Sequence, residues 1–383
     1  MAFADGHATS ATVRRHNASL VLAQVREHGT RSRADLARDT GLVKAAITSI
    51  VADLIEAGLL TETGLAPANG RGRPMMLLTL DGGPAVALGI EVNVDFLNAV
   101  AVTLGGEVVL SERLAVRSPT PVEARAAIVA IAEGLGRPLL GACIAVPGLV
   151  DPDTATVRHA PNLHWRDVRV ADWLPGGVAC DNDANLAVVA EHRRGAPADS
   201  AYLTGTVGVG AGLLLDGRVY RGGFGYAGEI GHMRIAGNDA LCGCGRTGCW
   251  EAVVGLETLH GRVAPGERGT YDEKVALLLA RATSGDPATL AALRDHGTWL
   301  GRGAAALLNL LNPRALILGG FFAVLAPWFL ETLRAELDAH VLAADLAPCD
   351  LRLSTLGVTA ASLGAADLVL NQVFADPLRF LTA

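Results

Sequence analysis

A cluster of metal-ligating side chains lies in the segment GHMRIAGNDALCGCGRTGCWE, residues 231–251. The candidate ligands are one histidine and three of the six cysteines: His232, Cys242, Cys244 and Cys249. Zinc takes four nitrogen or sulfur ligands in a tetrahedral arrangement, which matches this set. A tight turn can present the first two thiols together, and Gly245 and Gly248 allow the chain to fold back towards Cys249. We therefore predict one structural zinc ion per chain.

The other roles open to these cysteines are a redox trio or a set of buried free thiols. Both leave His232 and the two glycines without a function, so zinc binding is the favoured interpretation. Residues 1–20 lack the apolar core of a secretion signal, and we expect a cytoplasmic protein whose thiols stay reduced. The remaining cysteines, which we expect in apolar or isolated positions of the core, are Cys143, Cys180 and Cys349.

Composition and charge limit the class of protein. Half of the 383 residues are hydrophobic and 19% are charged, which indicates a folded chain with a sizeable core. No long uninterrupted apolar run is present, so we expect no contact with a membrane. The net charge of −7 argues against nucleic-acid binding over the whole surface. Residues 1–80, called the head below, carry nine basic and seven acidic residues, against 23 and 32 in the rest. This difference favours DNA contact by the head alone, although ordinary variation in surface charge also produces it.

The apolar spacing in the head predicts three helices and a hairpin. The first helix lies in RRHNASLVLAQVREH, and Ser32 with Asp35 forms a variant of the capping box for a second helix in SRADLARDTG. A third, amphipathic helix follows in VKAAITSIVADLIEAG after a glycine turn. Two strand-like runs, Leu59–Thr63 and Met75–Leu80, then enclose a basic loop. This order of elements predicts a winged helix-turn-helix.

Side chains that we expect to contact DNA lie at the starts of the second and third helices and in the wing. They are Ser32, Arg33, Lys44, Thr48, Ser49, Arg71 and Arg73. Because few of them can form paired hydrogen bonds to bases, recognition would depend on the third helix and the two wing arginines. A small helical module that binds a protein through a basic loop is the alternative.

Beyond residue 80 the sequence alternates between strand and helix patterns. Three successive strands are expected in VALGIEVNVDFLNAVAVTLGGEVVLSERL, then a buried strand in GACIAVPGLVD and a strand, loop and helix in VACDNDANLAVVAEHRRG. Two apolar strands in SAYLTGTVGVGAGLLLDGRVYRGG begin a second unit of the same kind. A further helix is expected in TAASLGAADLVLNQVF. The repetition predicts a second domain, residues 81–383, with two α/β lobes and a cleft between them.

Five motifs, PGLVD, NDAN, GGFGYAGEIGH, CGCGRTGCWE and LILGG, follow one another in the order typical of the ROK family of repressors, open reading frames and sugar kinases. The chain resembles that family over roughly residues 81–375, and the cysteine motif matches the family pattern C-x-C-G-x-x-G-C-x-E at every fixed position. The resemblance implies an α/β protein with a winged helix-turn-helix and a two-lobed, actin-like (ribonuclease H-like) sugar-kinase fold. It also implies that His232 and the three cysteines are the zinc ligands.

A sugar site beside the zinc cluster is a further implication of the resemblance. Its residues would be Gly148, Asn162, Asn182, Asp183, Glu229, His232 and Glu251. Carboxylates and amides suit neighbouring hydroxyl groups because they form hydrogen bonds in pairs. Zinc bound to one ring nitrogen would orient His232. Taken alone, the DNDAN segment could equally be a helix cap.

The segments that bind phosphate in the family's kinases differ in this chain. Where the first phosphate loop of the family reads D-x-G-G-T, this chain reads EVNVD from Glu91 to Asp95, without glycines and with an added negative charge. Thr206 and Val207 replace the Gly-Thr pair of the second loop, and Phe321 stands where the adenosine loop often has a glycine. These differences predict a protein that binds a sugar without transferring phosphate and that needs no ATP.

We therefore predict a sugar-responsive transcriptional repressor rather than an enzyme, with the head bound to double-stranded operator DNA as part of a homodimer or homotetramer. Sugar binding would shift the lobes and change the spacing of two heads, either releasing or favouring DNA. One alternative is a kinase for glucose or an N-acetylhexosamine, in which Asp183, the counterpart of the kinase base, acts on the sugar. Another is a DNA-binding protein whose body senses a protein partner.

Overall fold

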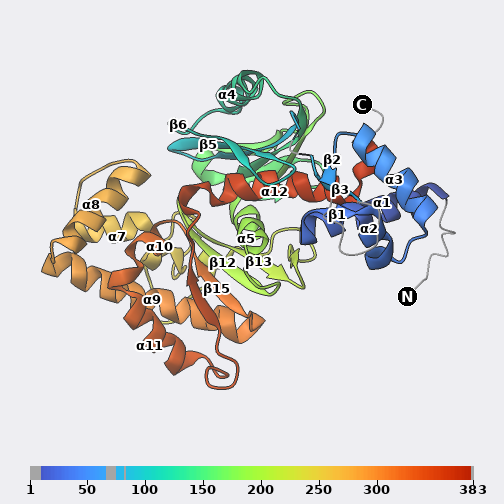
Figure 1. Ribbon diagram of the computed structural model, residues 1–383. Helices are drawn as coiled ribbons and strands as arrows, with labels where there is room; N and C mark the ends of the chain where they lie inside the picture. Colours follow the sequence, from blue (N-terminus) through green and yellow to red (C-terminus); the bar gives the residue numbers. More distant parts are fainter. Residues whose placement is uncertain (1–9, 66–74, 82, 381–383) are drawn as a thin grey trace.

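The computed structural model describes residues 10–65, 75–81 and 83–380. Three helices and a small sheet form the head at one end of the molecule (Figure 1). The helices are α1 (Ser10–His28), α2 (Arg33–Thr40) and α3 (Lys44–Glu56). The antiparallel strands lie in the order β1 (Arg31–Ser32), β3 (Met76–Leu80) and β2 (Leu60–Leu65). These elements confirm the three helices and the hairpin predicted from the sequence.

Local sequence signals set the ends of the head helices. The Ser32 hydroxyl accepts a hydrogen bond from the Asp35 backbone N–H, and the Asp35 carboxylate accepts one from the Ser32 N–H, which confirms the capping box. Gly41 ends α2 with a φ of +71°, a conformation that glycine adopts without strain. Ile47, Ile50 and Leu54 of α3 are buried, so this helix packs inward along one side and leaves the other to solvent.

The body contains two five-stranded sheets with the same topology. The first has the order β11 (Val178–Asn182), β7 (Leu139–Val146), β4 (Val86–Val92), β5 (Phe96–Thr103) and β6 (Val108–Ala115). The second has the order β16 (Asp350–Leu353), β15 (Ala315–Leu318), β12 (Ser200–Gly205), β13 (Val209–Leu215) and β14 (Arg218–Val219). In each sheet the central strand, β4 or β12, is the one that comes first in the chain. An antiparallel meander leads from it to one edge, and parallel strands lead to the other. This is the predicted pair of α/β lobes.

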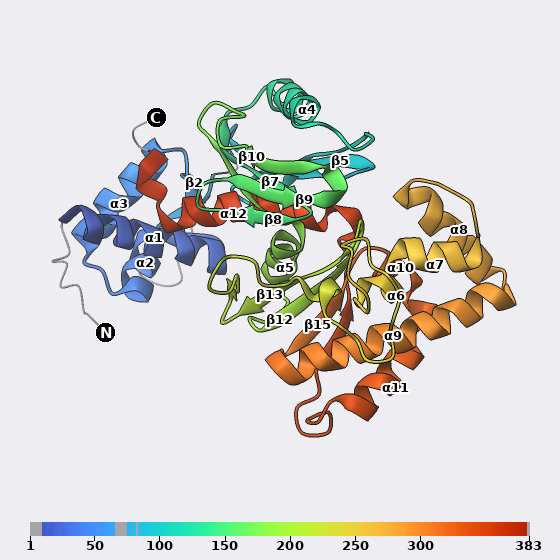
Figure 2. The same cartoon turned by 180° about the vertical axis from the view of Figure 1, so that it is seen from behind.

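Two helices pack against each other between the lobes: α12 (Ala360–Ala375) on the first sheet and α5 (Asp183–Arg193) on the second (Figures 1 and 2). A Cβ atom on Gly364 of α12 would lie 1.7 Å from the Leu186 carbonyl oxygen of α5, so only glycine fits at this crossing. By length and hydropathy Gly357–Ala375 resembles a membrane-crossing helix, but 67% of it is buried inside the fold. It is therefore the core helix of this molecule.

The remaining elements cover the outer faces of the sheets. A small antiparallel sheet beside β7 (Figure 2) contains β8 (Leu149–Asp151), β9 (Thr156–Ala160) and β10 (Trp165–Arg169). The outer helices are α4 (Pro121–Gly134) in the first lobe and α6 (Glu251–Val254), α7 (Leu256–Val263), α8 (Tyr271–Thr283), α9 (Pro287–Leu311), α10 (Phe321–Leu325) and α11 (Leu330–His340) in the second. Short 3-10 turns are η1 (Pro161–Leu163), η2 (Ile230–His232), η3 (Ala326–Trp328), η4 (Gly357–Thr359) and η5 (Pro377–Phe380).

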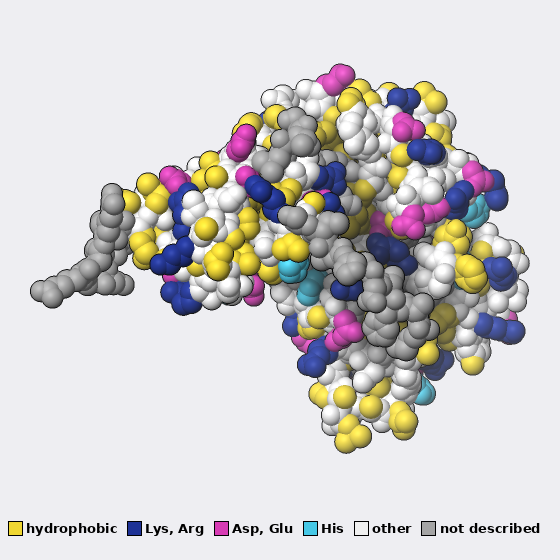
Figure 3. Space-filling model, turned by 90° about the vertical axis from the view of Figure 1, so that its right-hand side faces the viewer, with side chains coloured by type: hydrophobic (Ala, Val, Ile, Leu, Met, Phe, Trp, Pro, Cys, Tyr) yellow, Lys and Arg dark blue, Asp and Glu magenta, His cyan; other side chains and the backbone are white. Residues whose placement is uncertain are grey.

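The head packs against elements from the far end of the chain. One apolar cluster contains Val21 and Leu54 of the head together with Leu370 and Phe374 of α12. The turn η5 also contacts α1 and α3. Basic and acidic side chains are interspersed over the face of the molecule shown in Figure 3. The division predicted at residue 80 falls between β3 and β4, yet the buried core is continuous across it.

Candidate functional site

The cysteine-rich loop folds into a tight knuckle. The Cys242 N–H donates to the Arg246 carbonyl at 2.7 Å, and Cys249 forms an isolated antiparallel bridge with Arg234. Gly245 and Gly248 both have a φ of +83°, so the turns that the sequence predicted at these glycines are present. The backbone thereby returns Cys249 to the side of the knuckle where the first two cysteines lie.

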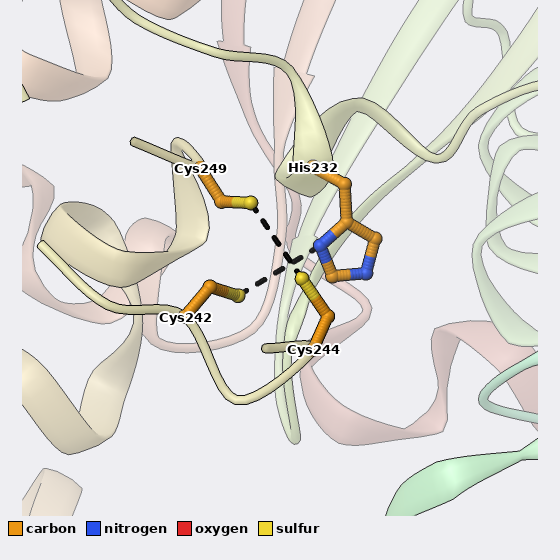
Figure 4. A group of neighbouring side chains, drawn as sticks. All are labelled: His232, Cys242, Cys244 and Cys249. Carbon is orange, nitrogen blue, oxygen red and sulfur yellow. Dashed lines mark hydrogen bonds between the residues drawn. The ribbon is translucent and has the colours of Figure 1, made fainter. Parts of the chain in front are cut away.

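Four ligand atoms converge in this knuckle (Figure 4). Those of His232, Cys242, Cys244 and Cys249 all lie within 4.8 Å of one another. Cys244 Sγ is 3.7 Å from Cys249 Sγ, and Cys242 Sγ is 3.9 Å from His232 Nδ1. Zn–S bonds of about 2.3 Å in a tetrahedron separate two sulfurs by about 3.8 Å, so the residues present fit zinc. The histidine would bind through Nδ1.

Two further side chains hold the knuckle in place. Asn238, which is 4% exposed and was not predicted, donates from Nδ2 to the Cys249 carbonyl at 2.8 Å and accepts from the Ala240 N–H at 2.9 Å. Glu251, at the start of α6, accepts a hydrogen bond from the Val209 N–H at 2.8 Å, and its other oxygen is 3.8 Å from Cys242 Sγ. Glu251 therefore links the cysteine loop to the first residue of β13.

Asn182 is the N-cap of α5. Its side-chain oxygen accepts from the backbone N–H groups of Ala184 and Asn185, and its Nδ2 donates to the Gly148 carbonyl at 3.1 Å. The helix-cap interpretation that the sequence left open is thus confirmed for this residue. Gly148 itself has a φ of +147°, and a Cβ there would lie 2.5 Å from the His159 carbonyl oxygen.

Acidic side chains from three segments lie within electrostatic reach of one another. Asp183, at the start of α5, is 7% exposed; burial raises its pKa to about 6, and the negative charge of Glu229 adds to the rise. Partial desolvation and the charge of Glu251 raise the pKa of Glu229, while His232 opposes the rise. The charges of four residues predicted to bind sugar therefore influence one another: Asp183, Glu229, His232 and Glu251.

Glu91 of β4, which begins the altered phosphate loop, joins this acidic group and was not among the predicted sugar ligands. Its side chain is 2% exposed and accepts from Asn93 Nδ2 at 3.0 Å. Burial raises the pKa of Glu91 to about 8, and the nearby negative charge of Asp183 contributes. Asn162, by contrast, stands exposed on η1 and, within the described residues, has no hydrogen bond to the other predicted sugar ligands.

The predicted DNA-contacting residues divide into three groups. Lys44, Thr48 and Ser49 are exposed on α3, although Thr48 Oγ1 also donates to the Lys44 carbonyl at 2.9 Å. Arg33 pairs with Glu62 of β2 at 2.9 Å, whereas Ser32 is 1% exposed and its hydroxyl is held in the capping box. Ser32 therefore stabilises the start of α2 instead of presenting a free hydroxyl. The wing arginines, Arg71 and Arg73, lie outside the described residues.

Replacing Asp183 with asparagine should stabilise the fold above about pH 6. Because the pKa of Asp183 is raised in the folded state, ionisation of this buried carboxyl lowers the free energy of unfolding. This cost is absent at about pH 4 and reaches its full size above about pH 6. The gain for Asp183→Asn should be on the order of 2 kcal/mol near pH 7.5. Urea unfolding at about pH 4.5 and about pH 7.5 measures it.

The exposed Asp153→Asn variant serves as the control and should change the free energy of unfolding little at either pH. An equal gain for Asp183→Asn at both pH values would contradict the expectation.

Head, lobes and knuckle together define a two-lobed, actin-like protein with a winged helix-turn-helix at its N-terminal side. The ROK family model matches residues 87–372, and the chain belongs to the ROK family. The xylose repressor of Bacillus subtilis is 30% identical over 374 residues, which cover 94% of this chain and 96% of that protein.

Two solved structures show how much of this chain is similar to a regulator and to a kinase of the family. A ROK family transcriptional regulator, described as a homolog of the E. coli MLC protein, superposes with a TM-score of 0.82 at 25% identity, covering 97% of this chain and 100% of that chain. A ROK family glucokinase from Streptomyces griseus, in complex with glucose and AMPPNP, gives a TM-score of 0.64 at 28% identity. That match covers 74% of this chain and 98% of the glucokinase. The regulator thus matches nearly the whole chain, and the kinase about three quarters of it.

Proposed function

We propose that this protein is a sugar-responsive transcriptional repressor. The observation that carries the proposal is the presence in one chain of a winged helix-turn-helix and a two-lobed body in which a group of acidic side chains lies beside a zinc-compatible knuckle. Full-length similarity to a xylose repressor and to a ROK transcriptional regulator supports it. The effector would be a monosaccharide or amino sugar, and two copies of the head would bind a two-fold operator.

The knuckle would hold one zinc ion through His232 and the three cysteines. When bound, zinc would fix the loop and orient the His232 ring, and it would take no part in a reaction. Asp183, Glu229 and Glu251 would accept hydrogen bonds from sugar hydroxyls, with Asn182 and Gly148 shaping the floor of the site. Asn162 is proposed only as a contact made after the lobes close. On the head, Arg33 and the exposed side chains of α3 would contact DNA, together with Arg71 and Arg73.

Two contacts support sensing without phosphate transfer. The Asp95 carboxylate accepts a hydrogen bond from the Tyr271 N–H at 2.7 Å, so an acidic side chain, not a phosphate, occupies this end of α8. The Phe321 ring packs so closely on Gly205 that a Cβ at this glycine would lie 2.7 Å from it. We infer that the segments corresponding to the kinase phosphate and adenosine loops are used here to pack the protein against itself.

A sugar kinase is the second candidate function. Asp183 favours it, because a buried carboxyl with a pKa of about 6 suits a general base. The similarity to a glucokinase with bound glucose and AMPPNP points the same way. Phosphorylation of a sugar with ATP and magnesium, lost in Asp183→Asn, would establish this function in place of the first.

The proposed function is tested with the purified full-length chain in two steps. Thermal denaturation with D-xylose, D-glucose, N-acetylglucosamine, and ATP with magnesium should show stabilisation by one sugar and none by ATP. A sugar at about 100 times its Kd adds about 2.7 kcal/mol of stability, and Asp183→Asn should lose this gain. DNA duplexes selected from a random library should then bind the wild type, bind Lys44→Ala more weakly, and change affinity when that sugar is added. Stabilisation by no sugar and selection of no duplex would reject the proposal.

A further inference from the structure

Helix α5 reaches from the candidate sugar site to the side of the molecule where the head docks. Its first residue is the buried Asp183, and its last residues lead into a pair of arginines, Arg193 and Arg194. Arg193 Nε lies 2.9 Å from Asp367 Oδ1, and Arg194 Nη1 donates to Asp367 Oδ2 at 2.7 Å. Asp367 belongs to α12 and is 0% exposed. One buried carboxylate therefore receives both cations from the end of α5.

A third arginine, from the head, binds α12 one turn beyond Asp367. Arg26 of α1 donates to Asn371 Oδ1 at 3.1 Å, and its guanidinium lies 4.5 Å from the centre of the Phe374 ring. Partial burial and the positive charge of Arg193 lower the pKa of Arg26, while Asp367 opposes this. The head thus contacts α12 at Asn371, one turn beyond the buried carboxylate that pairs with both arginines of α5. Such an arrangement is sensitive to small displacements because charges in a low-dielectric interior interact strongly.

The contacts along α5 leave little room for independent movement. A Cβ on Gly364 of α12 would lie 1.7 Å from the Leu186 carbonyl oxygen, and one on Gly212 of β13 would lie 2.0 Å from that of Ala184. Both glycines bring a neighbouring backbone into direct contact with the backbone of α5. A displacement at the N-terminal end of this helix must therefore be passed to its neighbours or to its C-terminal end.

We propose that α5 couples the sugar site to the head and that Asp367 is the junction through which the coupling passes. This inference rests on the proposed function and names the side chains through which sugar would regulate DNA binding. Sugar bound at Asp183 shifts α5, and the shift redistributes Arg193 and Arg194 around Asp367. Helix α12 passes the change to α1 through the contact of Asn371 with Arg26. The two states differ in how Arg193 and Arg194 share the carboxylate.

The test compares four full-length proteins: wild type, Asp367→Asn, Arg26→Gln and Asp376→Asn. Asp376, which directly follows α12, is the matched control because it pairs with Arg15 of α1 at 3.3 Å, but the two side chains are 36% and 54% exposed. The DNA is a duplex selected by the wild type, and the probe is whichever of D-xylose, D-glucose and N-acetylglucosamine raises the wild-type melting temperature.

We expect the sugar to change the DNA affinity of the wild type and the control by about fivefold or more, a typical allosteric coupling. In Asp367→Asn and Arg26→Gln the change should fall below about twofold, while the sugar-induced rise in melting temperature persists. Hydrogen exchange of α1 without DNA should respond to sugar in the wild type and not in these two variants. Since Asp367→Asn leaves the partly buried Arg193 without its anion and can fail to fold, Arg26→Gln at the surface of α1 decides the test alone in that case.

Wild-type coupling in a folded Arg26→Gln protein would overturn the inference and leave the proposed function standing. A wild type that binds sugar but does not alter its DNA affinity would instead reject the proposed function, and the inference with it.

Discussion

Replacing Cys249 with serine is expected to remove about one equivalent of bound zinc per chain and to abolish stabilisation by sugar. Cys249 is 2% exposed and its Sγ lies 3.7 Å from Cys244 Sγ, so the change to serine removes a buried thiolate and leaves three ligands. Without the ion, the His232 ring loses the bond that would orient it, and the backbone next to Glu251 is held only by its hydrogen bonds to Asn238 and Val209. Elemental analysis of the purified protein measures the zinc, and thermal denaturation with and without sugar measures the binding.

Cys349→Ser is the matched control. This cysteine is partly buried against the second lobe and belongs to no metal-ligand group among the described residues, so its replacement should keep zinc and the sugar response. Equal zinc content in Cys249→Ser and the wild type would show that the knuckle is not the metal site.

Replacing Gly364 with alanine should have the largest effect on folding, a loss of at least about 3 kcal/mol. The new Cβ would lie 1.7 Å from the Leu186 carbonyl oxygen and 2.4 Å from the carbonyl carbon. Both are backbone atoms of α5, so no side-chain rotation relieves the overlap, and the two central helices must separate. Urea unfolding followed by circular dichroism measures the change.

Gly261→Ala provides the comparison at a helical glycine with open surroundings. A Cβ at this exposed position of α7 would meet nothing within 4 Å, so the replacement should stabilise the protein by about 0.5–1 kcal/mol. If Gly364→Ala were instead as stable as the wild type, α5 and α12 would not be in the tight contact described here.

Elements with a local signature could be predicted from the sequence. The Ser32–Asp35 cap, the glycine that ends α2 and the paired strands of the wing each depend on a few neighbouring residues. The small sheet β8-β9-β10 was missed because its strands have three to five residues and carry exposed polar side chains such as Arg166 and Asp167. The contact between α5 and α12 joins residues far apart in the chain, and periodicity within either helix does not identify its partner.

In the candidate site, too, only features set by neighbouring residues could be predicted from the sequence. Spacing and glycines in the cysteine motif predicted a knuckle, because a turn that brings nearby thiols together is local geometry. Asn238 has no motif, and only the folded loop shows that its amide bridges Ala240 and Cys249. Glu91 was considered as a changed phosphate-loop residue, and its closeness to Asp183 follows from the way the two segments meet in three dimensions. Asn162, carried over from a motif, has no comparable contact among the described residues.

The packing of α12 and η5 against the head also determines how late in synthesis the head can dock on the body. Both are translated after every strand of the two sheets. A ribosome that adds about 5–20 residues per second needs tens of seconds to pass from α1 to α12. Throughout that interval the head helices can pack on one another, but the surfaces of α12 and η5 that they contact in the finished fold are absent. An interrupted chain therefore carries a folded head that is not yet held in place against the body by α12 and η5.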